Sequence, residues 1–475
     1  MATRGLGGSR RATRRAADLP AAHRANRGLA HAARPLTGPI RHRDAAPHID
    51  RHRAGCHGHH LRHGRHGDPD RPATAVDADA HPHPSDAHPD RTDSDSHNRP
   101  PIRGVPSCTR TTGDQGGFRF SLDGGATFFP GARALDLVAY TWDLDIDPRN
   151  PDIILELHQG ILYRSENAGC TFHVQTTFRG NLWDNLVRAP SDPDLLVASS
   201  IYEELLMVST DGGQTWQQEA LPDDVVHFAI DRTDPGHWTF AGRLAALYVR
   251  TAKEAKWETR PIRFSSDQQI VSASHVDLPA AGKVRWLVGS SLEGLYRSEN
   301  EGLSWQPASE ELYVPVGSPA EPVLSVVVVS VIFAPEDPDV AYTVVNRVGR
   351  NAAQRGIWRS ADGGHSWVQR VVDNQPVGDR KAQLTGGTQV FVSPHDPDHV
   401  FFAFGLSFGN YGTDLFRSKD GFQTLAVSHV DDFFEVKAMA FGPAAGTQQT
   451  PYVFVGASND KANQQSALAR HSKDN

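Results

Sequence analysis

An eight-residue phrase recurs along this chain and limits the folds open to it. It occurs as SLDGGATF at 121–128, STDGGQTW at 209–216, SENEGLSW at 298–305 and SADGGHSW at 360–367, with looser copies at 165–172 and 418–425. The serines that begin the copies at 121, 165 and 209 are spaced by 44 residues. A degenerate segment at 247–260, LYVRTAKEAKWETR, fills the longer gap before residue 298. Because a fixed period of about 20–50 residues is typical of stacked structural repeats, we predict a repeat protein.

Each repeat contains more than the phrase. An apolar segment that begins at a glycine precedes the phrase, as in GIWRSADGGHSW at 356–367. A turn rich in proline and aspartate comes earlier, as in VRAPSDPDLLVAS at 187–199. Proline fixes φ and aspartate accepts hydrogen bonds from nearby amides, so this turn is expected to join two strands. The flanking segments are rich in Val, Ile, Leu and Phe, which is typical of half-buried strands. Each repeat therefore predicts four β-strands.

The phrase itself predicts a structural turn. Its acid or amide can accept hydrogen bonds from turn amides, and its glycines can take the positive φ of a tight hairpin. The tryptophan that ends three copies is expected to pack between neighbouring repeats. These structural positions are Asp123, Asn167, Asp211, Asn300, Asp362 and Asp420, together with Trp216, Trp305 and Trp367.

The two ends of the repeat region complement each other. The N-terminal copy has no inner strands before it, whereas 436–443 and 451–458 are apolar strands with no phrase after them. Joined, they complete one sheet, which closes a ring and covers its edges. We therefore predict an all-β fold: one seven-bladed β-propeller over residues 110–460, closed by pairing of N- and C-terminal strands, with a disordered end at 461–475.

The first 109 residues differ in composition from the rest. Residues 1–105 contain 18 Arg, 14 His and 11 Asp but no aromatic residue, Lys or Glu, which gives a net charge of +7. The remainder has 30 basic and 45 acidic residues, a net charge of −15. Without large apolar side chains the first segment cannot form a core, so it is expected to be a disordered tail or an upstream or shifted reading frame. Its Arg-rich and His-rich stretches leave nucleic-acid or metal binding open, without convincing ligand spacing.

Compartment and redox state are only weakly indicated. No apolar segment near Met1 has the length of a signal peptide core. The most apolar stretch, at 323–334, is too short to cross a bilayer and is expected to be a buried strand. The three cysteines, Cys56, Cys108 and Cys170, do not form a disulfide scaffold, although a single bridge between Cys108 and Cys170 is possible.

The phrase S-x-D-G-G-x-[ST]-W resembles the Asp-box, or bacterial neuraminidase repeat. Similar propellers occur in sialidases, xyloglucan-active glycoside hydrolases, sortilin-type receptors and photosystem II assembly factors, so the resemblance implies a fold more strongly than a function. Sialidases also carry an Arg-Ile-Pro stretch, which is absent from this chain, where the nearest segment is Arg260-Pro261-Ile262-Arg263. Xyloglucanases usually have two facing propellers, and this chain has the repeats for one. The resemblance to single-ring assembly factors and secreted propellers implies binding rather than catalysis, and an extracellular or cell-envelope location.

A ligand site is expected where the inner strands begin. Trp142 and Trp183 each precede an aspartate on adjacent repeats, and either could stack on a ligand while Asp143 and Asp184 bind it. These two acids are also the candidate carboxylates of a glycoside hydrolase, which requires a pair about 5–5.5 Å apart for retention or about 6.5–9.5 Å for inversion. Alternatively, the tryptophans pack between blades and the acids cap strands. Further candidate ligand-binding residues at this rim are Asn185, His227, Gln389 and Glu435.

The leading hypothesis is a non-enzymatic binding or assembly scaffold. The alternative is a glycoside hydrolase of the xyloglucanase kind, with a sialidase less favoured. We expect no metal site and no cofactor, since no second His or Cys falls at metal-ligand spacing within the repeats. A protein or carbohydrate is the expected partner of a monomer, with no nucleic acid and no membrane span.

Overall fold

The structure is a computed structural model of the 475-residue chain. It describes residues 118–130, 141–158, 160–179, 183–200, 202–252, 255–265, 268–278, 283–314, 323–349, 354–403, 415–428, 434–445 and 450–458. The predicted tail at 1–109 and the predicted C-terminal end at 461–475 lie outside these residues, as does Cys108.

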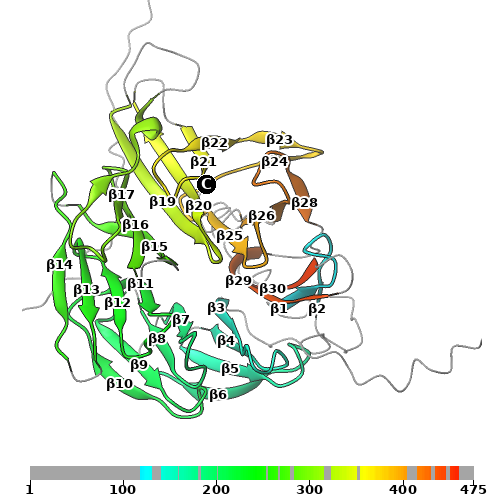
Figure 1. The fold of residues 1–475 in the computed structure, drawn as a ribbon. Helices are drawn as coiled ribbons and strands as arrows, with labels where there is room; N and C mark the ends of the chain where they lie inside the picture. Colours follow the sequence, from blue (N-terminus) through cyan, green and yellow to red (C-terminus); the bar gives the residue numbers. More distant parts are fainter. Residues whose placement is uncertain are drawn as a thin grey trace, which may run out of the picture. The chain divides into compact units, whose positions relative to one another are not determined.

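The described strands form seven four-stranded antiparallel sheets, and the prediction of an all-β, seven-bladed propeller is confirmed (Figure 1). Blade 1 contains β3 (Thr141–Ile146), β4 (Ile154–His158), β5 (Ile161–Ser165) and β6 (His173–Thr177). Blade 2 contains β7 (Asn185–Arg188), β8 (Leu196–Ser199), β9 (Leu205–Ser209) and β10 (Gln217–Ala220). Blade 3 contains β11 (Val225–Ile230), β12 (Trp238–Gly242), β13 (Ala246–Arg250) and β14 (Glu258–Pro261). Blade 4 contains β15 (Ile270–Leu278), β16 (Lys283–Ser290), β17 (Leu295–Ser298) and β18 (Gln306–Pro307). Blade 5 contains β19 (Ser325–Ala334), β20 (Asp337–Val348), β21 (Gln354–Ser360) and β22 (Val368–Val372). Blade 6 contains β25 (Gln389–Ser393), β26 (Asp396–Ala403), β27 (Leu415–Ser418) and β28 (Ala426–Ser428). Blade 7 contains β29 (Phe434–Ala445), β30 (Thr450–Ser458), β1 (Phe118–Ser121) and β2 (Phe129–Pro130).

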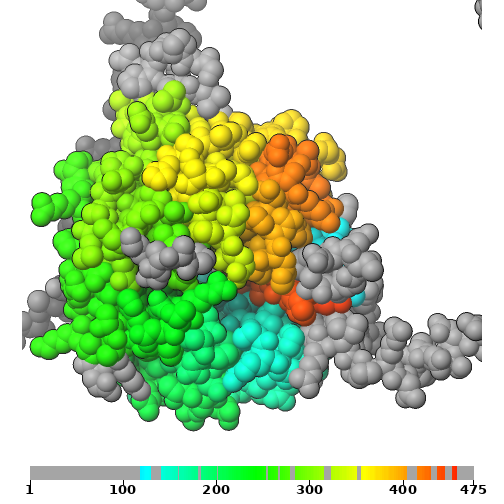
Figure 2. All heavy atoms as spheres, in the orientation of Figure 1, coloured from blue at the N-terminus to red at the C-terminus, as the bar shows by residue number. Residues whose placement is uncertain are grey.

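Blade 7 closes the ring by combining both ends of the repeat region. The N-terminal strand β1 pairs antiparallel with β30, with Phe120 opposite Phe454, and β29 follows as the innermost strand. The first strand of each blade contacts the first strand of the next, and β29 contacts β3. In the space-filling view the colours follow one another around the same ring (Figure 2). The predicted closure by N- and C-terminal strands is therefore confirmed.

The apolar core lies mainly between neighbouring blades. Leu155 and Leu157 of blade 1, for example, pack against Trp183, Leu186 and other side chains of blade 2. This follows from the strand period of two, since alternate side chains point to opposite faces of a sheet and each face meets another blade.

The Asp-box turns share one geometry, which either an aspartate or an asparagine can close. Ser360 Oγ donates to Asp362 Oδ1 and accepts the backbone N–H of Gly364 at 2.8 Å. Asp362 also accepts the hydroxyl of Ser366. In the box of blade 4 the last bond is reversed: Asn300 Nδ2 donates to Ser304 Oγ at 2.8 Å. Since a hydroxyl can donate or accept, aspartate and asparagine close the same turn.

Irregular features lie outside this pattern. The degenerate third repeat keeps its strands and Trp257, which packs against Phe240 and under the Arg250 guanidinium. Between blades 5 and 6 the chain forms an extra hairpin, β23 (Gln375–Val377) and β24 (Arg380–Ala382). The described residues contain a single 3-10 turn, η2 (Glu310–Tyr313), and none of their helices is long and apolar enough to cross a membrane.

Candidate functional site

Asp143 lies on β3 and bridges two blades. Its Oδ1 accepts the N–H of Leu144 at 2.8 Å, and its Oδ2 accepts the N–H of Leu186 on β7 at 2.7 Å. Burial raises the pKa of Asp143 to about 7, against the two amide hydrogen bonds and with further repulsion from Asp145 and Asp184. Ser272 and Ser274 make the same kind of link between blades 4 and 5, since they accept the N–H groups of Val331 and Phe333. Asp143 thus has a structural contact that needs no ligand.

The remaining rim residues of blades 1 and 2 also contact protein. Asp184 donates its N–H to the carbonyl of Ser199, and its carboxylate accepts Asn185 Nδ2 at 3.3 Å. Trp183 is fully buried, and its indole donates to the carbonyl of Arg179 at 3.0 Å. Trp142 lies under the ammonium group of Lys437, 5.4 Å from the ring centre. In this structure the Trp183 ring is covered by protein, as in the inter-blade packing alternative.

The other predicted rim residues are spread around the ring. His227 Nε2 lies 2.8 Å from His275 Nδ1 of the next blade, and burial lowers the pKa of His227 to about 3. Gln389 begins β25, and its buried side-chain oxygen receives no hydrogen bond from the described part of the chain. The side chain of Glu435 lies outside the described residues. Among the described residues, no group of three or more His, Cys, Asp or Glu side chains could hold a metal ion.

Exposed apolar side chains gather at one end of the blades. We call this end the loop face: it carries the turns between second and third strands, such as 202–204, 243–245 and 291–294, and the connections into each first strand. Of the 11 large apolar side chains exposed in the described residues, eight lie here: Tyr202, Leu244, Val271, Leu292, Val314, Leu324, Val348 and Val372. The Asp-boxes lie at the opposite end, the box face, where Leu303 is exposed.

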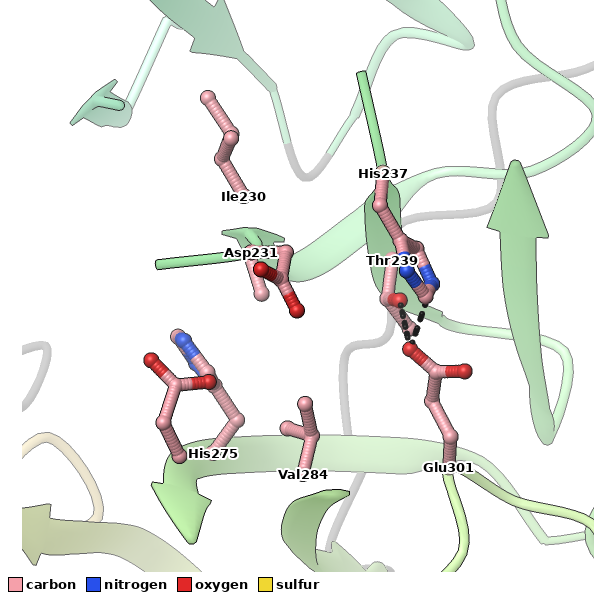
Figure 3. Close-up of a pocket in the computed structure, with 9 residues that line it drawn as sticks. Ile230, Asp231, His237, Thr239, His275, Val284 and Glu301 are labelled. Carbon is pink, nitrogen blue, oxygen red and sulfur yellow. Dashed lines mark hydrogen bonds and ion pairs between the residues drawn. The ribbon is translucent and has the colours of Figure 1, made fainter. Parts of the chain in front are cut away.

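A cleft at the box face separates blades 3 and 4 (Figure 3). Its inner part is narrow, with a cavity volume of about 10 Å³, and is lined by Ala229, Ile230, Asp231, His237, Thr239, His275, Asp277, Val284 and Glu301. An outer part, open to solvent, has a cavity volume of about 260 Å³ and adds Arg260, Asn300 and Leu303. Sequence reasoning did not identify this cleft, because its side chains come from separate strands with no common spacing.

Glu301 organises one wall of the cleft. It occupies the first glycine position of its Asp-box and takes a positive φ of 56°. Its carboxylate accepts His237 Nε2 at 2.8 Å, the Thr239 hydroxyl at 3.0 Å and Arg260 Nη1 at 3.1 Å. Burial alone would raise the pKa of Glu301, but the hydrogen bonds from His237 and Thr239 and the charge of Arg260 hold it below its usual value. The glutamate at a glycine position is the one signal in the sequence that could have pointed here.

Comparison with known proteins identifies the type of repeat. The model of the BNR/Asp-box repeat family matches residues 207–218, which include the third copy of the phrase. The chain carries the BNR/Asp-box repeat. A curated protein from Streptomyces mobaraensis, dispase autolysis-inducing protein, is 28% identical over 346 residues, which cover 72% of this chain and 87% of that protein.

Solved structures that match this chain are more distant in sequence. The GH74 xyloglucanase from Xanthomonas campestris is 18% identical with a TM-score of 0.47, and the match covers 72% of this chain and 52% of that one. This chain therefore spans about half the length of the xyloglucanase. YCF48 from Cyanidioschyzon merolae is 16% identical with a TM-score of 0.44, and the match covers 68% of this chain and 97% of that one.

Proposed function

We propose that this chain is a non-catalytic propeller that binds another protein through its loop face. The observation that carries the proposal is the concentration of exposed apolar side chains there, with Leu324 76%, Leu244 68% and Tyr202 59% exposed. Single exposed apolar residues are normal, but a contiguous group of them is typical of a protein-binding surface.

The loop-face turns are joined to one another by backbone hydrogen bonds. Leu292 of blade 4 accepts the N–H of Val326 in blade 5, and Leu324 donates to the carbonyl of Val348 within blade 5. The Arg243 guanidinium of blade 3 lies over the Tyr202 ring of blade 2, 5.5 Å from its centre. Ile270 of blade 4 also donates its N–H to the carbonyl of Arg243 in blade 3. The turns that carry the apolar side chains are therefore linked in series over blades 2 to 5, which reduces the ordering entropy lost on binding.

The similarity to dispase autolysis-inducing protein supports a protein as the partner. That name describes an effect on another protein, dispase, which cleaves itself. The match covers 87% of the relative, so it includes most of its length rather than one repeat. We therefore propose that this chain, too, acts on a protein partner by binding it, with autolysis of a protease as the specific outcome to test.

The disulfide state of Cys170 and the charge of the repeat region bear on where the protein acts. Cys170 is disulfide-bonded, and since Cys56 and Cys108 are the other cysteines of the chain, its partner lies outside the described residues. Disulfides persist in oxidising compartments, which supports an exported protein. The acidic repeat region disfavours nucleic acid as a ligand. We propose that the propeller acts as an exported monomer.

A glycoside hydrolase remains the second candidate because of one observation. Burial raises the pKa of Asp143 to about 7, which suits a general acid, and Asp184 is close enough to contribute to that shift. Both oxygens of Asp143 already accept backbone N–H groups, however, which favours the structural role.

The test uses the full chain with dispase as the probe. We expect the chain to bind dispase and to accelerate the loss of intact dispase, followed by gel electrophoresis and mass spectrometry. A Tyr202→Ser/Leu244→Ser variant should lose roughly tenfold or more in affinity, whereas Leu303→Ser removes an equally exposed leucine from the box face and should bind normally. Unchanged dispase together with no binding would refute the proposal. Release of reducing sugar from xyloglucan that disappears in Asp143→Asn/Asp184→Asn would establish the hydrolase instead.

A further inference from the structure

Blade 7 is built from two distant parts of the chain, unlike the other blades. In blades 1 to 6 the four strands follow one another in sequence. In blade 7, Ser121 ends β1 and Thr450 begins β30, 329 residues later, and the two strands pair over four residues each. Because bringing distant segments together costs more chain entropy than closing a hairpin, the pairing of β1 with β30 is the step of ring closure that is hardest to maintain.

The closing strand β1 packs against the Asp-box of blade 1, and a disulfide lies at the same place. The Phe118 ring meets the Phe172 ring edge-on, with 4.9 Å between their centres. A Cβ on Gly169 would come within 2.4 Å of the Phe118 ring, so strand and box are in close contact. Between these two box residues lies Cys170, which is buried and disulfide-bonded. The chain therefore enters β1 directly beside the disulfide.

The cysteine bonded to Cys170 precedes β1. The other cysteines of the chain are Cys56 and Cys108, and both lie outside the described residues. Counted back from Phe118, Cys108 is 10 residues away and Cys56 is 62 residues away. Ten extended residues reach about 33 Å, enough to return to the neighbouring box. Since the entropy cost of closing a loop grows as (3/2)RT ln n, the nearer cysteine is favoured roughly fifteenfold.

We infer that Cys170 is bonded to Cys108 and that this disulfide is a redox-controlled clasp on the closing strand. The two thiols lose two protons and two electrons to a thiol–disulfide oxidoreductase, which is reduced to its dithiol as the S–S bond forms. The chain already leads from β2 to β3 of blade 1, so the bond ties the β1–β2 segment to blade 1 at both ends and holds β1 ready for β30. In a reducing compartment the clasp is open, so the ring is fully secured only after export. The inference concerns ring closure and does not rest on binding at the loop face.

The experiment is hydrogen exchange of the full chain, followed by mass spectrometry, before and after reduction of the folded protein with a phosphine. We expect the amides of β1 and β30 to exchange at least about tenfold faster after reduction, since loss of the bond lets β1 separate locally. Amides of β12 in blade 3, on a sheet built from consecutive strands, should exchange at the same rate in both states. Peptide mapping without reductant identifies which cysteine is joined to Cys170.

Serine variants connect the effect to one cysteine pair. Cys108→Ser and Cys170→Ser should each show the fast exchange of β1 and β30 without any reductant. Cys56→Ser is the matched control and should behave as the unmodified chain, including its response to reduction. Because reduction acts on the folded protein, the test stands even where a serine variant does not fold. A peptide that joins Cys56 to Cys170 overturns the pairing. Equal exchange of β1 and β30 before and after reduction, or faster exchange spread evenly over all blades, overturns the clasp.

Discussion

A buried glutamate at the closure of the ring gives the sharpest stability prediction. Glu156 on β4 is fully buried and accepts the Thr141 hydroxyl, while its Oε2 has no hydrogen-bond partner among the described residues. The seam to blade 7 is tight here: a Cβ on Gly456 of β30 would come within 2.2 Å of the Thr141 side chain. Next to Glu156, His158 is also buried, and neither of its ring nitrogens forms a hydrogen bond with a described residue. Its Nδ1 lies 4.0 Å from Glu156 Oε1.

Burial acts on the two groups with opposite sign. It raises the pKa of Glu156 from 4.5 to about 7, against the hydrogen bond from Thr141, and lowers that of His158 from 6.5 to about 4. Stability associated with Glu156 is therefore complete below pH 4.5 and is lost as pH rises to 7, by about 3 kcal/mol at about 1.4 kcal/mol per pH unit. Stability associated with His158 is complete above pH 6.5 and is lost as pH falls to 4, by a similar amount. Between pH 4.5 and 6.5 the loss of stability from Glu156 with rising pH and the gain from His158 cancel.

Glu156→Gln removes the pH dependence of the unfolding free energy that comes from Glu156 and leaves the one that comes from His158. Relative to the unmodified chain, the variant should gain about 3 kcal/mol of unfolding free energy between pH 4.5 and 7 and no more above pH 7. Denaturant unfolding at a series of pH values, followed by tryptophan fluorescence, measures this difference, and other titrating groups cancel in it. Glu166→Gln, at a side chain that is 66% exposed, is the control and should give a nearly constant difference.

The opposite sign would refute the reasoning. If Glu156 and His158 formed a charged pair, the glutamate pKa would be lowered, and the glutamine variant would lose stability as pH rises through that window. A difference that does not depend on pH would mean that the folded state leaves the pKa of Glu156 at its ordinary value.

Three further predictions concern the repeat turns and the rim. Gly125→Ala should destabilise the fold by about 2–5 kcal/mol in denaturant unfolding, because the residue has a φ of 82° and a Cβ would lie 2.3 Å from the Phe401 ring; Gly378→Ala, with a φ of 61° and open space, should lose only about 1–2 kcal/mol. Asp362→Asn should stay within about 0.5 kcal/mol, because the asparagine boxes close the same turn, whereas Asp362→Ala should lose about 1–3 kcal/mol; comparable losses in both variants would contradict the shared geometry. Asp143→Leu should destabilise by about 2–4 kcal/mol in the same assay, since it leaves two backbone N–H groups without acceptors, whereas Asp143→Asn should be mild; equal effects would show that these bonds contribute little.

The architecture could be predicted because each repeat contains the sequence signals for its own strands and turns. The spacing of the serines, the proline turns and the Asp-box fixed the number of blades, and even the degenerate segment at 247–260 kept enough strand pattern to be counted. Closure was predictable for a similar reason, since the N-terminal copy lacked inner strands and the C-terminal end lacked a box. All of these signals are local in sequence, and the propeller repeats local units.

Contacts between blades were not predictable in the same way. Glu156 meets Thr141 within blade 1, and its environment is set by β30, about 300 residues later in the sequence. Asp231 and Asp277 share a cleft although they belong to different repeats and hold different positions within them. Periodicity assigns a residue to a strand and a face, but it does not say which side chain of the next blade lies opposite.

The inner-strand acids illustrate this limit. From sequence, a tryptophan before an aspartate on two adjacent blades suggested a paired site for a sugar, with Asp143 and Asp184 as equivalents. In the structure the two differ: Asp143 accepts the backbone of the next blade, whereas Asp184 accepts the side chain of its own neighbour Asn185. Serines make the same inter-blade link in blade 4, so what this position requires is an acceptor and not a carboxylate. A catalytic acid must be free to exchange a proton with substrate, and Asp143 could do so only by giving up hydrogen bonds that join blades 1 and 2.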